Sequence, residues 1–306
     1  MPPGLKTLAA VAAAAAMVGA AVVGRNALDT KSERDDLRLT VVCDPLAEVF
    51  CQAAAAADDR LTIKVESPDV TTKRLTGLNA GERPDFQAWV SVGPWLQMAD
   101  GRRGGQAPLQ RGTVSVASSR LVLVTRSGQT IGCSGKPPAG CLPLDRNRLG
   151  LPSPLRSGVG LAGLAQIVLA RTGIAAAELD RGAIESGPAG AAIDVVARAT
   201  DPNPASVGQQ VAANFSLANP VVTTQAATAP VAGRVALVLS DPPLRAVLQI
   251  GLLDPVAQGP LGTEEPAGRE LAKAATDLGW DPAGDLAGGL PDPGVLAALQ
   301  DAWPGS

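Results

Sequence analysis

One local pattern constrains this chain most: four times, an apolar stretch runs into a two-residue turn that ends in proline, and a helix pattern follows. The turns are Asp44-Pro45, Ser67-Pro68, Gly93-Pro94 and Ser153-Pro154. Proline suits the first helical position because it lacks the N–H donor and has a fixed backbone angle, and a small or capping residue before it favours a helix start. Strands that alternate with helices need crossover connections. The sequence therefore predicts an α/β fold built on mainly parallel sheets flanked by helices.

Periodicity gives a coarse map of the elements. Apolar runs predict strands near residues 38–43, 61–66, 86–92, 114–125, 148–151, 193–196 and 234–239. Helical patterns predict helices near residues 45–58, 70–80, 94–99, 158–172, 175–181, 206–214, 242–252, 266–278 and 293–302. Because aromatic residues make up only 2% of the chain, aliphatic side chains must fill the core.

Three of the few aromatic residues, Phe86, Trp89 and Trp95, lie within "PDFQAWVSVGPWLQMAD". Side chains alternate along a strand, so Phe86 and Trp89 fall on opposite faces. A strand covered by helices on both sides needs bulk on both faces. The cluster is therefore predicted to be mainly structural and to mark the third strand, with Trp95, in the turn that follows, as its one functional candidate.

Residues 1–25 have the features of a targeting segment. Lys6 precedes the uncharged run "TLAAVAAAAAMVGAAVVG", which ends at Arg25, and a charged linker covers residues 26–37. A signal peptide and an uncleaved membrane anchor both fit, and the pattern favours a transmembrane anchor because Ala-x-Ala-like cleavage sites occur only inside the run. Both alternatives predict an extracytoplasmic location in the cell envelope, anchored to the membrane or secreted.

The four cysteines form two local pairs, Cys43 with Cys51 and Cys133 with Cys141, each with seven residues between. Four cysteines allow three connectivities, and local pairing is the economical one in an oxidising compartment. A zinc site would need a spacing of about two to four residues within each pair, so the spacing argues against a metal. We expect two disulfides, of which the second clips the loop "SGKPPAG".

Charge and composition argue against nucleic-acid binding and against enzyme activity. The net charge of −3 predicts no affinity for nucleic acid, although the segment from Arg102 to Arg156 carries nine Lys or Arg and one acid, Asp145. That segment is either a solvated basic face or a site for an anionic ligand or partner. The chain has no His, "SGK" at 134–136 lacks a phosphate-loop context, and "GVGLAG" is only a run of small residues. We expect no enzyme activity, no cofactor and no metal.

The order of these segments resembles a known family. The segments are "LTVVCDPLAEVFCQAAAA", "VESPDVTTKRLTGLNAGERPDFQAWVSVGPWL" and "VASSRLVLVTRSG", and residues 80–96 carry the likeness best. The chain is similar to the bacterial extracellular solute-binding proteins of the type 2 periplasmic-binding fold, which serve ABC transporters. The resemblance implies that residues 38–125 and 232–306 form lobe one. Residues 126–231 would then form lobe two, with the hinge and the disulfide-clipped loop.

This family closes two lobes around a small ligand by hinge motion, and the resemblance places the ligand at the turns described above. The implied ligand-binding residues are Asp44, Ser67, Ser91, Trp95, Ser118, Ser119, Ser153, Ser157 and Thr224. Asp44, Ser67 and Ser153 have a structural alternative to ligand binding, which is to cap the helices that follow them.

Asp44 also bears on the kind of ligand. A carboxylate at this turn would repel an anion, and few aromatic rings are available for a stacked cage. The ligand is therefore expected to be small and polar or cationic, captured for an importer. The alternative is a cell-envelope binding module that keeps the fold and recognises a protein partner.

Overall fold

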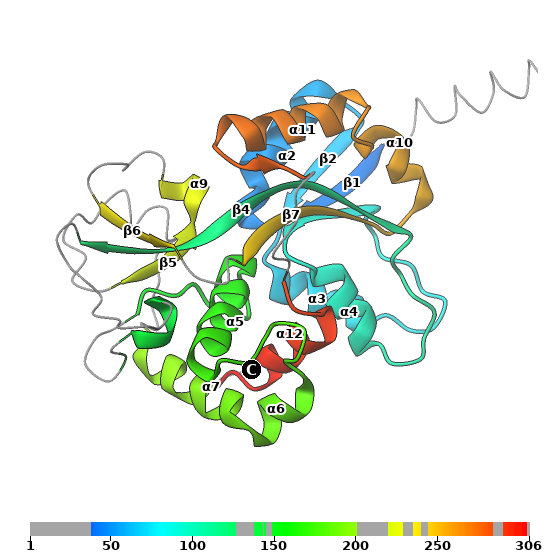
Figure 1. Cartoon of the computed structure of the whole chain (residues 1–306). Coiled ribbons are helices and arrows are strands. Elements are labelled where there is room, and N and C mark those ends of the chain that lie inside the picture. The colour runs from blue at the N-terminus through cyan, green and yellow to red at the C-terminus, as the bar shows by residue number, and fades with distance from the viewer. Residues whose placement is uncertain are drawn as a thin grey trace, which may run out of the picture.

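Figure 1 shows the computed structural model of the chain. The structure describes residues 38–126, 138–142, 144, 149–200, 220–228, 235–239, 244–283 and 290–304. Within these residues, no helix combines the length and the apolar character that crossing a bilayer requires. Residues 1–37, which hold the predicted targeting segment and linker, lie outside the described part of the chain.

The first three strands are parallel, as the sequence predicted. Strand β1 (Leu39–Cys43) pairs on one side with β2 (Leu61–Val65) and on the other with β3 (Ala88–Val92). The full order of the sheet is β2-β1-β3-β7-β4-β5, with β6 and β8 also paired to β4. Four helices cover this part of the sheet (Figure 1). On one side lie α2 (Glu48–Ala57) and α11 (Pro266–Asp277), and on the other lie α3 (Pro68–Thr76) and α4 (Trp95–Arg102).

The proline turns begin helices at three of the four predicted places. A short 3-10 helix, η1 (Pro45–Ala47), follows Asp44 and leads into α2, while α3 begins at Pro68 and α4 follows Pro94. The fourth turn, at Ser153-Pro154, is not itself a helix start. Helix α5 (Gly158–Thr172) begins four residues later, because the Ser157 side chain accepts a hydrogen bond from the Gly160 N–H and caps it.

Two long strands cross the molecule. Strand β4 (Gly112–Arg126) pairs antiparallel with β7 (Arg245–Leu252) up to Arg120, and from Leu121 onward with β5 (Val221–Thr224) and β6 (Val235–Leu239). Strand β7 also pairs antiparallel with β3. These crossing strands make the sheet mixed. Parallel pairing outside β1 to β3 is limited, in the described residues, to two bridges, Leu149 with Thr200 and Gly150 with Val221.

The remaining elements complete the second lobe and join the two. We use the name lobe two for α5, α6 (Arg181–Ser186), α7 (Pro188–Ala199), β5, β6, the short helix α9 (Gln225–Thr228) and the 3-10 helix η2 (Pro138–Cys141). Strand β6 is included because it pairs with the same end of β4 as β5 does, whereas the resemblance had assigned residues 232–306 to lobe one. Lobe one contains β1 to β3 with α2, α3, α4 and α11. The other described elements are η4 (Pro255–Ala257), α10 (Gln258–Leu261), β8 (Asp281–Pro282) and α12 (Pro293–Asp301). The two-lobed α/β architecture is thus confirmed.

Three expected elements were wrong and one cannot be judged. Residues 242–252 were predicted as a helix and contain β7, and residues 193–196 were predicted as a strand and lie inside α7. Both faces of β7 are buried, so its apolar run carries no period that separates a strand from a helix. The helix expected at 175–181 is a turn that precedes α6. The helix expected at 206–214 lies outside the described residues.

The aromatic cluster is part of the core, as predicted. Phe86, Trp89 and Trp95 are each no more than 1% exposed. Elsewhere in the core, the rings of Phe50 on α2 and Trp280 after α11 pack edge to face with centroids 5.9 Å apart. Helices α2 and α11 therefore share one apolar layer over the sheet of lobe one.

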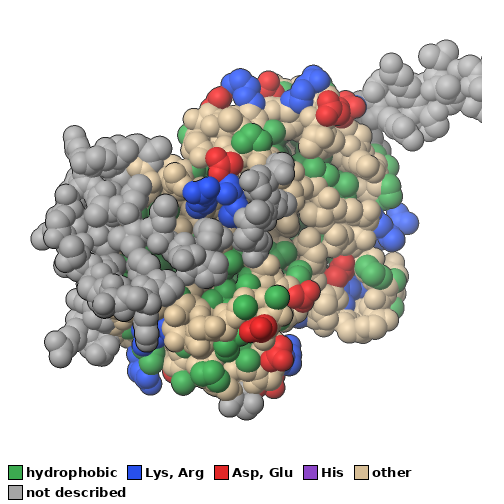
Figure 2. All heavy atoms as spheres, viewed as in Figure 1, with side chains coloured by type: hydrophobic (Ala, Val, Ile, Leu, Met, Phe, Trp, Pro, Cys, Tyr) green, Lys and Arg blue, Asp and Glu red, His purple; other side chains and the backbone are tan. Residues whose placement is uncertain are grey.

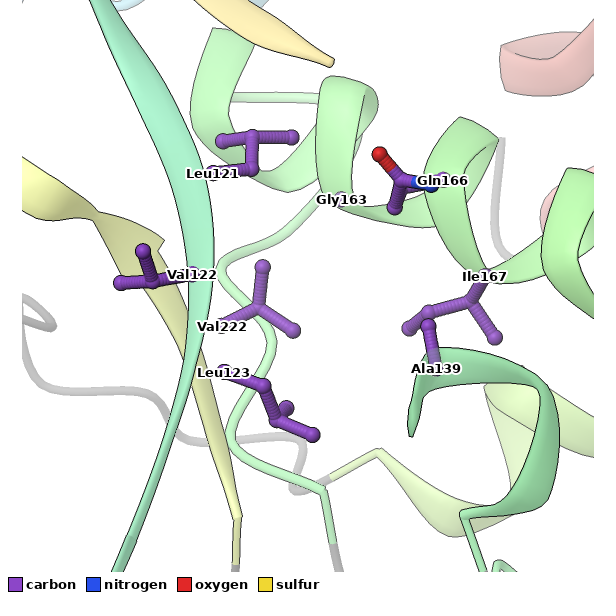
Figure 3. Close-up of a pocket in the computed structure, with 8 residues that line it drawn as sticks. All are labelled: Leu121, Val122, Leu123, Ala139, Gly163, Gln166, Ile167 and Val222. Carbon is purple, nitrogen blue, oxygen red and sulfur yellow. The ribbon is translucent and has the colours of Figure 1, made fainter. Parts of the chain in front are cut away.

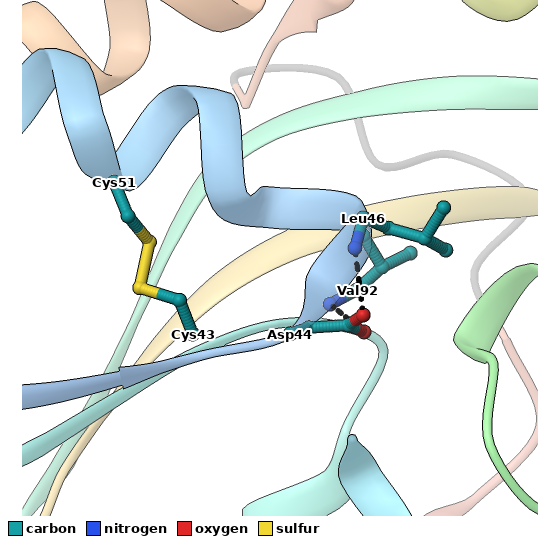
Figure 4. Close-up of a disulfide and its surroundings, with 5 residues drawn as sticks. All are labelled: Cys43, Asp44, Leu46, Cys51 and Val92. Atoms are coloured by element: carbon teal, nitrogen blue, oxygen red, sulfur yellow. Dashed lines mark hydrogen bonds between the residues drawn. A yellow bond between two sulfur atoms is a disulfide. The ribbon is translucent and has the colours of Figure 1, made fainter. Parts of the chain in front are cut away.

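The disulfide between Cys43 and Cys51 is confirmed and joins the end of β1 to α2 (Figure 4). Both cysteines are buried. Cys141 is also disulfide-bonded, while its predicted partner, Cys133, lies outside the described residues. The described residues contain no group of acidic, cysteine or histidine side chains that could hold a metal ion.

Candidate interlobe binding site

Asp44 lies directly after β1, at the carboxyl edge of the parallel strands. Its carboxylate accepts hydrogen bonds from the Leu46 N–H, at 2.9 Å, and from the Val92 N–H, at 3.4 Å (Figure 4). The residue is 1% exposed. Asp44 therefore caps η1, as the structural alternative predicted. It is also a buried acidic group that binds the backbone of both turns, the one after β1 and the one after β3.

Burial raises the pKa of Asp44 to about 6 from 3.8, and the two backbone hydrogen bonds offset part of that rise. No lysine or arginine among the described residues forms an ion pair with this carboxylate. A carboxylate can accept about four hydrogen bonds, and this one accepts two. Asp44 is thus a buried acid with spare acceptor capacity and without a cation beside it.

The turn after β3 packs against Asp44. Ser91 and Trp95 are both buried, and each donates a hydrogen bond to a backbone oxygen of this turn. The Ser91 hydroxyl donates to the Gly93 oxygen at 3.3 Å, and the Trp95 indole N–H donates to the Val92 oxygen at 2.8 Å. Gly93 has a φ of 103°, which a residue with a side chain rarely adopts. These two predicted site residues hold the shape of the turn.

Lobe two meets this turn at the start of α5. A Cβ atom added to Gly158 would lie only 1.7 Å from the Val92 carbonyl oxygen, so the two backbones are in direct contact. A Cβ added to Gly160 would lie 2.1 Å from the Pro152 oxygen. The small residues of "GVGLAG" are therefore required by close backbone approach, which is a packing role. The sequence had placed Ser157 in the site, and the structure puts it beside this contact as the cap of α5.

An ion pair joins the lobes next to the same contact. Arg156 of lobe two lies 3.2 Å, Nε to Oδ2, from Asp69 on α3 of lobe one. Ser67, which is half-buried, donates to the other Asp69 oxygen at 2.5 Å, and half-buried Ser153 begins the turn that carries Arg156. Ser67 does not cap α3 with its side chain. Sequence reasoning missed Asp69 and Arg156, because nothing local signals a pair 87 positions apart in the chain.

The other predicted residues form a separate group where the strands cross. The buried Ser118 hydroxyl accepts a hydrogen bond from Arg245 Nε at 2.9 Å, and Arg245 also pairs with Asp281. Ser119 accepts from the Ala226 N–H at 3.1 Å, and Thr224 accepts from the Ala227 N–H at 3.3 Å. Ser118 and Ser119 therefore fasten β4 to β7 and α9, and Thr224 joins the end of β5 to α9.

A small cavity lies between β4 and α5 (Figure 3). Its volume is about 20 Å³, and its lining is apolar except for Gln166: Leu121, Val122, Leu123, Ala139, Gly163, Gln166, Ile167 and Val222. A water molecule fits such a volume, whereas ligand sites measure roughly 300–1,000 Å³. This cavity is therefore a packing void and not the candidate site.

Three described cations of the basic segment have individual partners. Arg103 is buried and donates to the Leu75 oxygen at 2.9 Å, Arg102 pairs with Asp301, and Arg156 pairs with Asp69. In the view of Figure 2, basic side chains are dispersed and most have an acidic one nearby. Lys136, Arg146 and Arg148 lie outside the described residues. These three cations therefore serve folding and interlobe contacts, and this view shows no single basic patch.

Comparison with known proteins bears on the fold. No family model matches the sequence, and the search of curated proteins finds no match. Among solved structures, the periplasmic binding protein AfuA from Actinobacillus pleuropneumoniae, bound to fructose-6-phosphate, superposes with a TM-score of 0.54 at 10% identity. The match covers 87% of this chain and 95% of that one. A periplasmic thiamin binding protein superposes with a TM-score of 0.51 at 13% identity, over 86% and 95% of the two chains.

The chain has the type 2 periplasmic-binding fold. A GABA receptor gives a third match, with a TM-score of 0.52, 12% identity and coverage of 88% of this chain and 90% of that one. The type 2 periplasmic-binding fold accounts for the two crossing strands and for the meeting of the carboxyl-edge turns of lobe one with the start of α5. At such low identity the likeness concerns the fold alone, so the function must be argued from the residues.

Proposed function

We propose that the chain is an extracytoplasmic solute-binding protein that captures a small polar ligand with a cationic group between its two lobes. The ligand contacts the turns after β1, β2 and β3 of lobe one and the start of α5 of lobe two. Open α/β sheets bind ligands outside the carboxyl ends of their strands, which is where these turns lie. An importer is the partner that such a receptor would serve, and no catalytic step is assigned to the site.

Asp44 is the observation that carries this proposal. A buried carboxylate without a cation is costly, and a ligand ammonium or amidinium group would supply the missing charge. Two backbone N–H groups already fix the carboxylate in place, so its remaining oxygen lone pairs are oriented before a ligand arrives. An anionic ligand would be repelled at the same position.

The ion pair between the lobes supports the same choice of ligand. Arg156 reaches from lobe two to Asp69 at the edge that also holds Asp44, so this edge of lobe one already accepts one cation from across the lobes. The solved structures with this fold include proteins named for thiamin and for GABA and one bound to fructose-6-phosphate. Ligand choice in this fold therefore depends on the residues at the turns.

The location follows from the leader and the cysteines. The apolar run before residue 25 is typical of an exported chain, and the disulfide between Cys43 and Cys51 is stable in an oxidising compartment. Both features support an extracytoplasmic location for the two lobes. Whether the leader is cleaved or anchors the protein is decided by the mass of the N-terminal peptide of the protein purified from its membrane fraction.

A thermal-shift screen tests the proposal. The panel contains small organic cations, each with a neutral and an anionic compound of similar size. We expect at least one cation to raise the melting temperature of the wild-type protein, and Asp44→Asn to abolish that rise. Asp277→Asn, at an exposed pair on α11, is the matched control and should keep it. Stabilisation by anions alone, or a shift that Asp44→Asn leaves intact, would overturn the proposal.

One observation favours a second candidate, a cell-envelope module that binds a protein. The direct contact of Gly158 with Val92 leaves no space for a ligand between those two backbones. Leu46, Val49, Val65 and Val70 are also exposed at or near the carboxyl edge of β1 and β2. A photo-crosslinking residue at Val49 would then capture one defined envelope protein in cells, whereas the same residue at exposed Leu278 would not. Equal capture at both positions would exclude this function.

A further inference from the structure

Helix α12 packs against both lobes at once. It contacts α4 of lobe one and α5 and α6 of lobe two, and it lies between them as the red helix of Figure 1. Its apolar residues Leu296 and Leu299 are fully buried. A helix that buries apolar side chains in two bodies resists their separation, because opening would return that surface to water.

Gln300 fastens α12 to lobe two. Its side chain is buried, and its Nε2 donates a hydrogen bond of 2.9 Å to the Pro154 oxygen. Pro154 belongs to the turn that leads into α5. A 2.9 Å hydrogen bond from the Ser157 N–H to the Ser153 oxygen closes this turn. This turn carries Arg156 and leads directly to Gly158. Gln300 therefore holds the segment of lobe two that contacts lobe one.

Arg102 fastens the same helix to lobe one. It is the last residue of α4, and its Nη2 lies 2.8 Å from Asp301 Oδ1 and donates to the Ala297 oxygen at 3.4 Å. Helix α4 begins directly after Gly93 and Pro94, the turn that Gly158 touches. Both sides of the interlobe contact are thus connected through one helix.

We propose that α12 is an interlobe strap: it holds the two lobes closed in the absence of ligand, and it must loosen before they separate. Gln300 is the residue of α12 that holds the turn at 153–157 in position, through its hydrogen bond to the Pro154 oxygen. The strap rests on contacts within the chain and does not depend on which ligand, if any, the site takes. If a solute does bind, it enters through the open form, so the strap slows association by lowering the population of that form.

The test uses the ligand-free protein, so that its outcome is independent of the proposed ligand. Gln300→Ala and Arg102→Ala are compared with wild type by hydrogen exchange and by small-angle scattering. Gln258→Ala, at an exposed position on α10, and Lys273→Ala, in an exposed pair on α11, are the matched controls. Each strap variant should speed exchange of the amides at 153–163 by about fivefold to tenfold, the loss expected for one hydrogen bond, and should expand the molecule.

Two outcomes would overturn the strap. In the first, α12 exchanges faster while the amides at 153–163 and the molecular dimensions stay at their wild-type values. In the second, exchange rises uniformly through both lobes, which would make α12 an ordinary part of the core. Should Gln300→Ala fail to fold, Arg102→Ala decides the question, because its side chain lies at the partly exposed end of the strap.

Discussion

Asp44 is the residue on which both the fold and the proposed site depend. It ends the first strand, caps the helix that follows and binds the backbone of the third strand's turn. The sequence predicted the first two roles, because a polar residue before proline is typical of the end of a strand and the start of a helix. The third depends on a residue 48 positions away, which no local pattern reveals.

The pH dependence of stability is the first prediction. The folded pKa of Asp44 is about 6, above its ordinary value of 3.8, so the protonated form is favoured by folding. The stabilisation is complete below the ordinary value and is lost as the pH rises through 6, and it amounts to about 3 kcal/mol. Asp44→Asn should remove this loss of unfolding free energy between pH 4 and pH 7, as measured by urea unfolding.

Asp58 provides a control of opposite sign. The side-chain hydrogen bond from Arg60 holds the pKa of Asp58 below its ordinary value. Its contribution to stability is present at neutral pH and is lost as the pH falls through that lowered pKa. Asp58→Asn should therefore lower the unfolding free energy at pH 7 and leave the loss between pH 4 and pH 7 in place. Identical pH profiles for wild type and Asp44→Asn would contradict the burial argument.

The disulfide between Cys43 and Cys51 gives a second prediction at the residue scale. It closes a loop with a sequence separation of 8. The chain-entropy model assigns such a loop about 2 to 3 kcal/mol. The double variant Cys43→Ala/Cys51→Ala should lose roughly that much unfolding free energy, as measured by urea unfolding. A variant as stable as wild type would show that the native contacts around η1 suffice without the bond.

At the scale of the elements, the start of α5 is the critical contact. Gly158→Ala would place a Cβ 1.7 Å from a backbone oxygen, so the lobes must shift apart. We expect a larger radius of gyration and a loss of about 1 to 3 kcal/mol in unfolding free energy. Gly101→Ala is the control, because nothing lies within 4 Å of a Cβ there and the position is inside α4. It should be neutral or gain about 0.5 to 1 kcal/mol.

The elements also show what the sequence could reveal. The proline turns predicted β1, β2, β3 and their helices because capping and backbone geometry act locally. Strand β7 was missed because both of its faces are buried, so its apolar residues show no alternation along the strand. A strand was wrongly predicted at 193–196, inside α7, whose buried face holds β-branched Ile193 and Val196 together with three alanines. β-branched residues favour strands, and tertiary packing overrides that preference here.

At the scale of the whole molecule, the order of segments predicted a two-lobed fold, and the solved structures confirm it. The contacts between the lobes were not predictable. Asp69 with Arg156 and Gln300 with Pro154 join residues that only the tertiary fold brings together. The predicted site residues divide in the same way: Asp44, Ser91, Trp95 and Ser157 meet at one contact, while Ser118, Ser119 and Thr224 serve the crossing strands.

Proton release on binding tests most directly the claim that Asp44 is the counter-charge for a cationic ligand. A cation beside this carboxylate lowers its pKa, so binding at pH 6 should release about half a proton, and binding at pH 8 almost none. Titration calorimetry in buffers of different ionisation enthalpy measures this number for wild type and for Asp44→Asn. We predict that cation binding releases protons from the wild type at pH 6 and almost none at pH 8. Binding of a cation without proton release, or with the same release from Asp44→Asn, would contradict the account.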